Sequence, residues 1–129
     1  MKRFAAVPLA ALLLLALSTI YVIAAEPSIS KSVLAGGEDA TVYVLKVTAS
    51  GSDIYGLTIE ETSGSVADIV SPNGWSGIAA GSYVAFNTYD KPIKDGTSMM
   101  FRIIATSKDA SFTVKFHDQN SRIGSDKTI

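Results

Sequence analysis

Cysteine is absent from this chain of 129 residues, which excludes disulfide bonds, thiolate metal sites and cysteine nucleophiles. Histidine occurs once, at His117, so a zinc site made of several histidines is excluded as well. No G-x-S-x-G turn presents a serine nucleophile, and no glycine-rich loop is suited to hold a phosphate. The sequence therefore contains none of these catalytic motifs.

One pair of carboxylates remains, Glu60 and Glu61, but adjacent residues of a strand point to opposite faces of a sheet. They cannot flank one substrate bond as the two acids of a glycosidase do. We predict that the protein is not an enzyme and needs no cofactor.

Basic clusters are also lacking. Residues 26–129 contain 9 Lys and Arg against 12 Asp and Glu, which gives a net charge of −3. Binding to nucleic acid requires a basic patch, so we expect no nucleic-acid partner.

The first 25 residues differ in character from the rest. Lys2 and Arg3 precede an uncharged apolar run, Phe4–Ala25. A basic start, an apolar run and small residues at its end are typical of a secretory signal peptide. Cleavage is expected after Ala24 or Ala25.

A membrane anchor formed by residues 4–24 is the alternative, because about 20 apolar residues are long enough to cross a bilayer as a helix. In both cases residues 26–129, predicted to be a single domain, lie outside the cytoplasm. A membrane is then contacted only through the N-terminal segment.

The rest of the chain alternates apolar and polar residues with a period of two, which is typical of β-strands. Short turn sequences separate the alternating segments, no helical repeat follows residue 26, and the last residues, 122–129, are expected to fray. This spacing indicates an antiparallel β-sandwich or barrel, with the first segment as an edge strand. The segments are Ser28–Leu34, Ala40–Ala49, Ile54–Thr62, Ser65–Val70, Ser82–Tyr89, Thr97–Thr106 and Ser111–Asp118.

The only tryptophan, Trp75, lies in the turn-rich stretch SPNGWSG, and two interpretations are open. The favoured one is that the indole fills the core from a loop that runs from Pro72 to Gly77, because aromatic side chains bury a large area. The other is that Trp75 is displayed to a ligand. With Tyr43, Tyr55, Tyr83 and Tyr89 it would then form a platform for sugar rings.

The polar run after the last strong strand offers candidate metal ligands at His117, Asp118, Asn120 and Asp126. It does not match the calcium loop of an EF-hand, because the fixed glycine and the terminal glutamate are missing. A solvated strand end is the simpler interpretation, and we expect no metal site.

Residues 69–105 combine a P-x-G-W loop, a V-x-F strand, an I-x-x-G turn and an F-x-I strand, in "IVSPNGWSG" and "YVAFNTYDKPIKDGTSMMFRIIA". This arrangement resembles the Ig-like β-sandwich domains of secreted bacterial and archaeal proteins. The resemblance implies an all-β, antiparallel Ig-like sandwich of about seven to eight strands. It implies no catalytic residue. From its own composition, the apolar segment at the N-terminus is expected to precede the sandwich as a helix, either as a signal peptide or as an anchor.

One bacterial family of copper-associated exported domains has a broadly similar stretch. Its copper site uses an N-terminal histidine of the mature protein and a tryptophan. No histidine lies near the predicted mature start at Ala25 or Glu26, so copper is not expected here.

Together these observations favour a non-catalytic extracytoplasmic module at the cell surface, with a structural, adhesive or assembly role that depends on protein contacts. Self-association through the edge strand Ser28–Leu34 is the expected mode. One alternative is a pilin-like or anchored filament subunit that retains its N-terminal helix. The other is a module that binds glycans or divalent metal ions.

Overall fold

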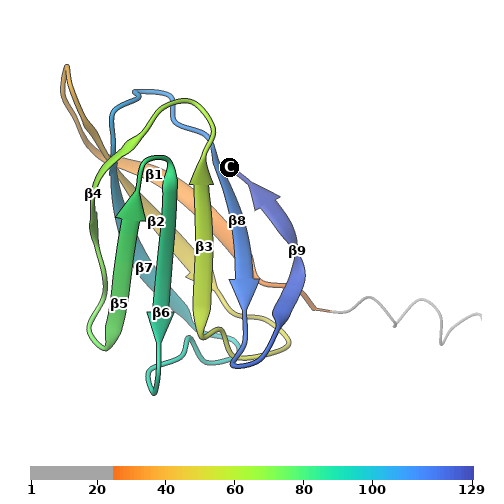
Figure 1. Ribbon diagram of the computed structural model, residues 1–129. Coiled ribbons are helices and arrows are strands. Elements are labelled where there is room, and N and C mark those ends of the chain that lie inside the picture. The colour runs from red at the N-terminus through yellow and green to blue at the C-terminus, as the bar shows by residue number, and fades with distance from the viewer. Residues whose placement is uncertain (1–24) are drawn as a thin grey trace, which may run out of the picture.

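The computed structural model describes residues 25–129, and the predicted signal peptide or anchor lies outside this range. Two antiparallel sheets pack face to face (Figure 1), and no helix among the described residues is long and apolar enough to cross a membrane. The strands are β1 (Ser28–Gly36), β2 (Thr41–Thr48), β3 (Gly56–Glu61), β4 (Val66–Val70), β5 (Trp75–Ala80), β6 (Tyr83–Thr88), β7 (Ser98–Ala105), β8 (Phe112–His117) and β9 (Arg122–Thr128).

The four-stranded sheet has the order β1-β2-β7-β4, and the five-stranded sheet has the order β5-β6-β3-β8-β9. All pairs are antiparallel. The prediction of an all-β sandwich is confirmed, and β1 is an edge strand as predicted.

The strand β5 was not expected from the sequence. The predicted loop from Pro72 to Gly77 instead ends at Gly74, which has a φ of +83°, and Trp75 begins the strand. The segment WSGIAA contains glycine and alanine, which have low strand preference, so its pattern is weak. A tight turn at Gly81, with a φ of +62°, places β5 beside β6 and supplies the pairing partner.

The C-terminal residues do not fray, contrary to expectation, but form β9 against β8. The carboxylate of Glu26, before β1, accepts hydrogen bonds from Ser125 N at 3.0 Å and Lys127 Nζ at 3.1 Å. These contacts, 99 or more residues apart in the sequence, attach the start of the domain to its last strand. With β5 and β9 the sandwich has nine strands rather than seven to eight.

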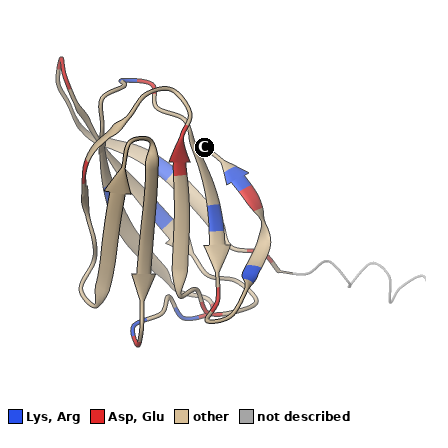
Figure 2. Ribbon diagram, in the orientation of Figure 1, with Lys and Arg blue, Asp and Glu red and all other residues tan. Residues whose placement is uncertain are grey.

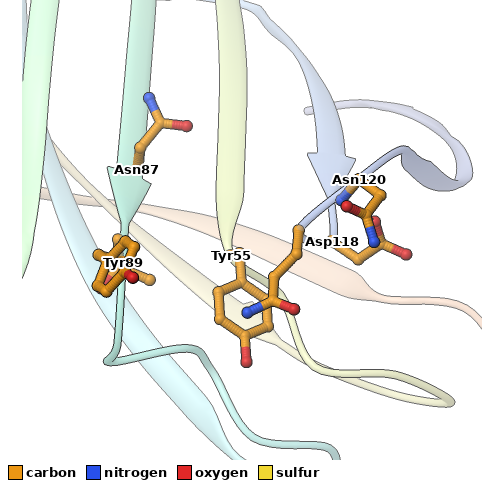
Figure 3. A pocket seen from close by; sticks show the side chains of 7 residues that line it. Tyr55, Asn87, Tyr89, Asp118 and Asn120 are labelled. Atoms are coloured by element: carbon orange, nitrogen blue, oxygen red, sulfur yellow. The ribbon is translucent and has the colours of Figure 1, made fainter.

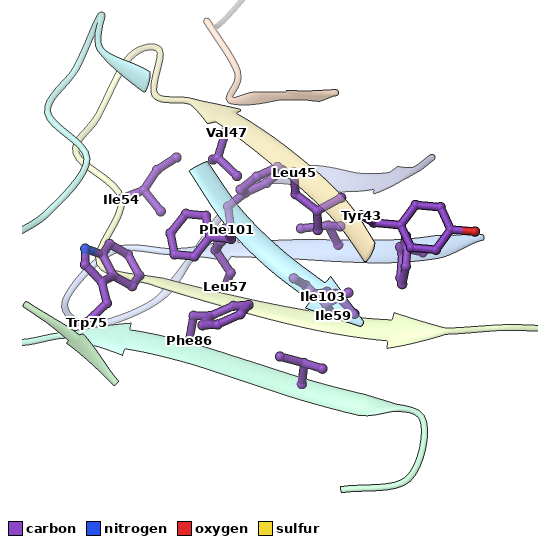
Figure 4. Close-up of a cluster of buried hydrophobic side chains, with 14 of the residues drawn as sticks. Tyr43, Leu45, Val47, Ile54, Leu57, Ile59, Trp75, Phe86, Phe101 and Ile103 are labelled. Atoms are coloured by element: carbon purple, nitrogen blue, oxygen red, sulfur yellow. The ribbon is translucent and has the colours of Figure 1, made fainter. Parts of the chain in front are cut away.

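The core lies between the two sheets (Figure 4). Because side chains alternate along a strand, every second residue of each central strand points into it. Phe101 of β7 is at its centre, with its ring centroid 4.9 Å from that of Phe86 and 5.0 Å from that of Trp75. Burying each such side chain contributes roughly 1.5–3 kcal/mol. This burial holds the domain together without disulfide bonds.

Trp75 is a core residue with 7% of its surface exposed. Its Nε1 donates a hydrogen bond of 2.8 Å to the carbonyl oxygen of Lys91, and its ring meets Phe101 edge to face. The favoured interpretation of the sequence is confirmed, because the indole is turned into the core and offers no face to a ligand.

Glu61 is the exception among the core-facing residues, because it carries a carboxylate at 2% exposure. Ser63 Oγ donates to Oε1 at 3.3 Å, while Oε2 has no hydrogen-bond partner among the described residues. Its neighbour Glu60 is exposed, so the two carboxylates do point to opposite faces. Burial raises the pKa of Glu61, against the lowering effect of the hydrogen bond from Ser63.

We expect Glu61→Gln to stabilise the domain at neutral pH by about 1–2 kcal/mol, because an unpaired buried charge is replaced by a neutral group. Because the pKa of Glu61 is raised in the folded state, its protonated carboxyl stabilises the fold fully at a pH below the ordinary pKa of 4.5. This contribution is lost as the pH rises through the folded-state pKa. The gain from the substitution should therefore grow with pH. Urea denaturation at a series of pH values measures it, and an equal gain at pH 4 and pH 8 would contradict the assignment.

Candidate functional site

A cavity of about 480 Å³ opens at one end of the central strands of the five-stranded sheet, where β6 and β8 end and β3 begins. Figure 3 shows Tyr55 between Tyr89 on one side and Asp118 and Asn120 on the other. We call this cavity the tyrosine pocket. It is lined by Tyr55, Asn87, Thr88, Tyr89, Asp118, Gln119 and Asn120.

Backbone pairing brings these distant segments together, because β3 lies between β6 and β8. Tyr55 N donates to the carbonyl oxygen of His117 at 2.8 Å, and Thr88 N donates to that of Tyr55 at 3.0 Å. The start of β3 is thereby fixed to the end of each neighbour. The side chains of the pocket consequently stand on ordered backbone, although one of them follows β6 and three come from the turn after β8.

Gly56 makes room for one lining residue. It pairs with Asn87 in the sheet, and a Cβ at position 56 would lie 2.9 Å from Asn87 Oδ1. Ordinary contacts of a Cβ are longer than this, so any larger residue would displace the amide. The glycine therefore sets the position of the Asn87 side chain.

The turn that carries Asp118 is closed by its own side chain. Oδ1 accepts hydrogen bonds from the backbone N–H groups of Asn120 at 2.8 Å and Ser121 at 2.7 Å. These two bonds hold the pKa of Asp118 below its ordinary value, so the carboxylate is ionised at neutral pH. The carboxylate of Asp118 is thus held in place as a negative charge at one wall of the pocket.

The opposite wall is aromatic. Tyr89 follows β6 and is 94% exposed, whereas Tyr55 is only partly exposed. All seven lining side chains carry a hydrogen-bonding group, and none is aliphatic. The pocket therefore combines two phenol rings with amide, hydroxyl and carboxylate groups.

The five aromatic candidates from the sequence are divided between three places. Tyr55 and Tyr89 line the tyrosine pocket, Tyr83 is 49% exposed at the opposite end of β6, and Tyr43 and Trp75 are in the core. They do not form the single platform that the sequence left open.

The four candidate metal ligands also separate. Asp118 and Asn120 line the pocket, but Asp126 is ion-paired with Arg122 on β9. His117 Nε2 lies 3.3 Å from Thr58 Oγ1 on the outer surface of the sheet. Within residues 25–129, no group of three or more His, Asp or Glu residues is arranged to hold a metal ion.

The pKa of His117 is lowered, first by partial burial and then by the positive charges of Arg122 and Lys115. The imidazole is therefore mainly neutral at pH 7. It is available as a hydrogen-bonding group beside the pocket, not as a positive charge.

Asn87, Thr88 and Gln119 were not predicted from the sequence as site residues. Asn87 is the next-to-last residue of β6 and looks like any other polar strand position, and Gln119 lies in a run of polar turn residues. Only the pairing register shows that they are neighbours. Gly56 of β3 pairs with Asn87 on one side and with His117, two residues before Gln119, on the other.

No protein-family model matches the sequence, and no curated protein sequence matches it. Solved structures do match. A DUF4466 family protein from Parabacteroides merdae ATCC 43184 has a TM-score of 0.51 at 7% identity, covering 81% of this chain and 43% of that chain.

A GH20 exo-β-N-acetylglucosaminidase from Vibrio harveyi has a TM-score of 0.50 at 14% identity, covering 80% of this chain and 17% of that chain. The ChBD2 domain from Thermococcus kodakarensis KOD1 has a TM-score of 0.47 at 18% identity, covering 74% of this chain and 91% of that chain. At such low identity, the chain is similar to the first two proteins in its β-sandwich fold alone.

Proposed function

We propose that the protein is a non-catalytic, extracytoplasmic β-sandwich module that binds a carbohydrate in the tyrosine pocket. The observation that carries the proposal is the lining of the pocket. Two phenol rings, one of them 94% exposed, line it together with amide, hydroxyl and carboxylate groups, and no aliphatic side chain is among the lining residues.

This chemistry suits a sugar better than an apolar ligand. A pyranose ring presents C–H groups on its faces and hydroxyl groups around its rim. The ring of Tyr89 provides an apolar surface for the C–H groups, while Asn87 and Asp118 supply hydrogen-bond partners for the hydroxyls. The volume of about 480 Å³ lies within the roughly 300–1,000 Å³ of small-ligand sites.

An extracytoplasmic location rests on the N-terminal sequence. Both interpretations of residues 1–25, as a cleaved signal peptide or as an anchor, place the β-sandwich outside the cytoplasm. A glycan-binding role fits that location, since polysaccharides are abundant on cell exteriors.

We expect the protein to be retained by at least one immobilised oligosaccharide in a panel of glucose, xylose, mannose and N-acetylglucosamine oligomers. Tyr89→Ala should weaken this retention by at least about tenfold, because loss of a central aromatic contact at a binding site commonly costs 1–2 kcal/mol or more. Binding is measured by retention on the panel and by titration calorimetry with the retained sugar.

Tyr83→Ala is the matched control, because Tyr83 is an exposed tyrosine at the other end of the same strand. It should leave retention unchanged. No retention of the wild-type protein by any sugar in the panel would overturn the proposal, as would an equal loss in the two variants.

A further inference from the structure

The hairpin formed by β1 and β2 projects beyond the body of the sandwich (Figure 1). Its tip is closed by a hydrogen bond of 2.8 Å from Gly37 N to the carbonyl oxygen of Ala40, and it carries Glu38 and Asp39. Figure 2 shows this projecting end as acidic. Val33 and Leu34, just before the tip, are 58% and 56% exposed. The tip is therefore an acidic end with an apolar base.

The outer face of the four-stranded sheet has the complementary composition. Three rows of paired residues cross this face. Val42 lies beside Ile104, and Lys46 lies beside Met100. In the row between them, Arg102 has Val44 on one side and Val70 on the other. Val70 is 48% exposed and Met100 60%. The apolar residues of this face are Val42, Val44, Val70, Met100 and Ile104.

The charges on these two surfaces are unpaired within the described residues. Lys46 and Arg102 are exposed and take part in none of the ion pairs of residues 25–129, and the same holds for Glu38 and Asp39. The one acid on the outer face, Asp68, lies on the edge strand β4, and its Oδ1 accepts a hydrogen bond from Ile69 N.

We propose that the acidic hairpin tip of one copy docks on the outer face of the four-stranded sheet of a second copy. Glu38 and Asp39 would pair with Lys46 and Arg102. The apolar residues next to the tip would at the same time cover the apolar residues of the outer face. The two surfaces are different patches of one molecule, so the contact is head-to-tail and builds an open chain of copies rather than a closed dimer.

This contact differs from strand pairing through Ser28–Leu34. Lys31, on the core side of β1, donates to the carbonyl oxygen of Ala110 and lies 5.7 Å from the ring centroids of Tyr43 and Phe112. An inward-pointing charge on an edge strand disfavours the addition of another strand. Charge reversal separates the two modes, because backbone pairing along β1 does not require the tip or face charges.

The test uses protein produced from the full 129-residue chain and sedimentation velocity over a concentration series at low salt. We expect concentration-dependent association of the wild type that weakens with added salt. The tip variant Glu38→Lys/Asp39→Lys and the face variant Lys46→Glu/Arg102→Glu should each raise the apparent dissociation constant by at least about tenfold.

A head-to-tail contact makes a further, specific prediction. An equimolar mixture of the tip variant and the face variant should associate again, because each then meets an opposite charge on the other. A single chain with all four reversals should also associate. Lys91→Glu/Lys115→Glu, which changes the net charge by as much as the face variant but away from both surfaces, should behave as the wild type.

The following results would overturn the proposal. One is a wild type that remains monomeric at all concentrations. Another is association that persists in both charge-reversed variants, which would indicate strand pairing. A third is a mixture of the two variants that does not associate although circular dichroism shows both variants folded. Monomeric wild type that co-sediments with vesicles of anionic phospholipid would assign the face to lipid instead, which also overturns the proposal.

Discussion

Trp75→Ala is expected to destabilise the domain by about 3–5 kcal/mol, the usual range for removing a large buried aromatic side chain. The substitution leaves a cavity beside Phe101, which loses its edge-to-face partner, and it leaves the carbonyl oxygen of Lys91 without its donor. Because small domains are stable by only about 5–15 kcal/mol, this loss removes a large part of the free energy of unfolding.

Urea denaturation followed by far-ultraviolet circular dichroism measures this effect without depending on the indole signal. Tyr89→Ala is the control and should change stability by no more than about 0.5 kcal/mol, since Tyr89 is 94% exposed. A Trp75→Ala protein as stable as the wild type would show that the indole is not part of the core.

Tyr43→Phe should cost about 1–3 kcal/mol although it removes a single oxygen atom. Tyr43 is 1% exposed, and its hydroxyl accepts a hydrogen bond from Ala110 N at 3.0 Å while facing the carbonyl oxygens of Ser107 and Lys108. Phenylalanine leaves the buried Ala110 N–H without a partner. The hydroxyl thus attaches the loop between β7 and β8 to β2.

The loss is read from thermal unfolding and from the exchange rate of the Ala110 amide hydrogen, which should increase. Tyr83→Phe removes a hydroxyl from a half-exposed tyrosine and should be nearly neutral. Equal effects of the two substitutions would mean that the Tyr43 hydroxyl has no special role.

Alternation in the sequence predicted most of the core correctly, because a period of two is a local property of each strand. Leu45 and Val47 face inward as their spacing indicates, and Phe112, Val114 and Phe116 do the same. The strand β5 was missed because its residues have weak strand preference and it depends on β6 for pairing.

The tyrosine pocket could not be assembled from the sequence, because its residues are brought together by pairing register. Tyr55, Asn87 and Asp118 are more than 30 positions apart, and only their common proximity to the start of β3 makes them neighbours. Tyr89 was a candidate for its residue type alone. Its exposure, and the burial of Trp75, were decided by the turns at Gly74 and after Thr88.

The proposed function requires that a sugar bind in the tyrosine pocket. An amide chemical-shift titration of isotope-labelled protein with the oligosaccharide that it retains tests this directly. We predict that the largest shifts occur at Asn87, Tyr89, Asp118 and Asn120, which surround the tyrosine pocket. Shifts concentrated on the outer face of the four-stranded sheet, or no shifts with any sugar of the panel, would contradict the proposed function.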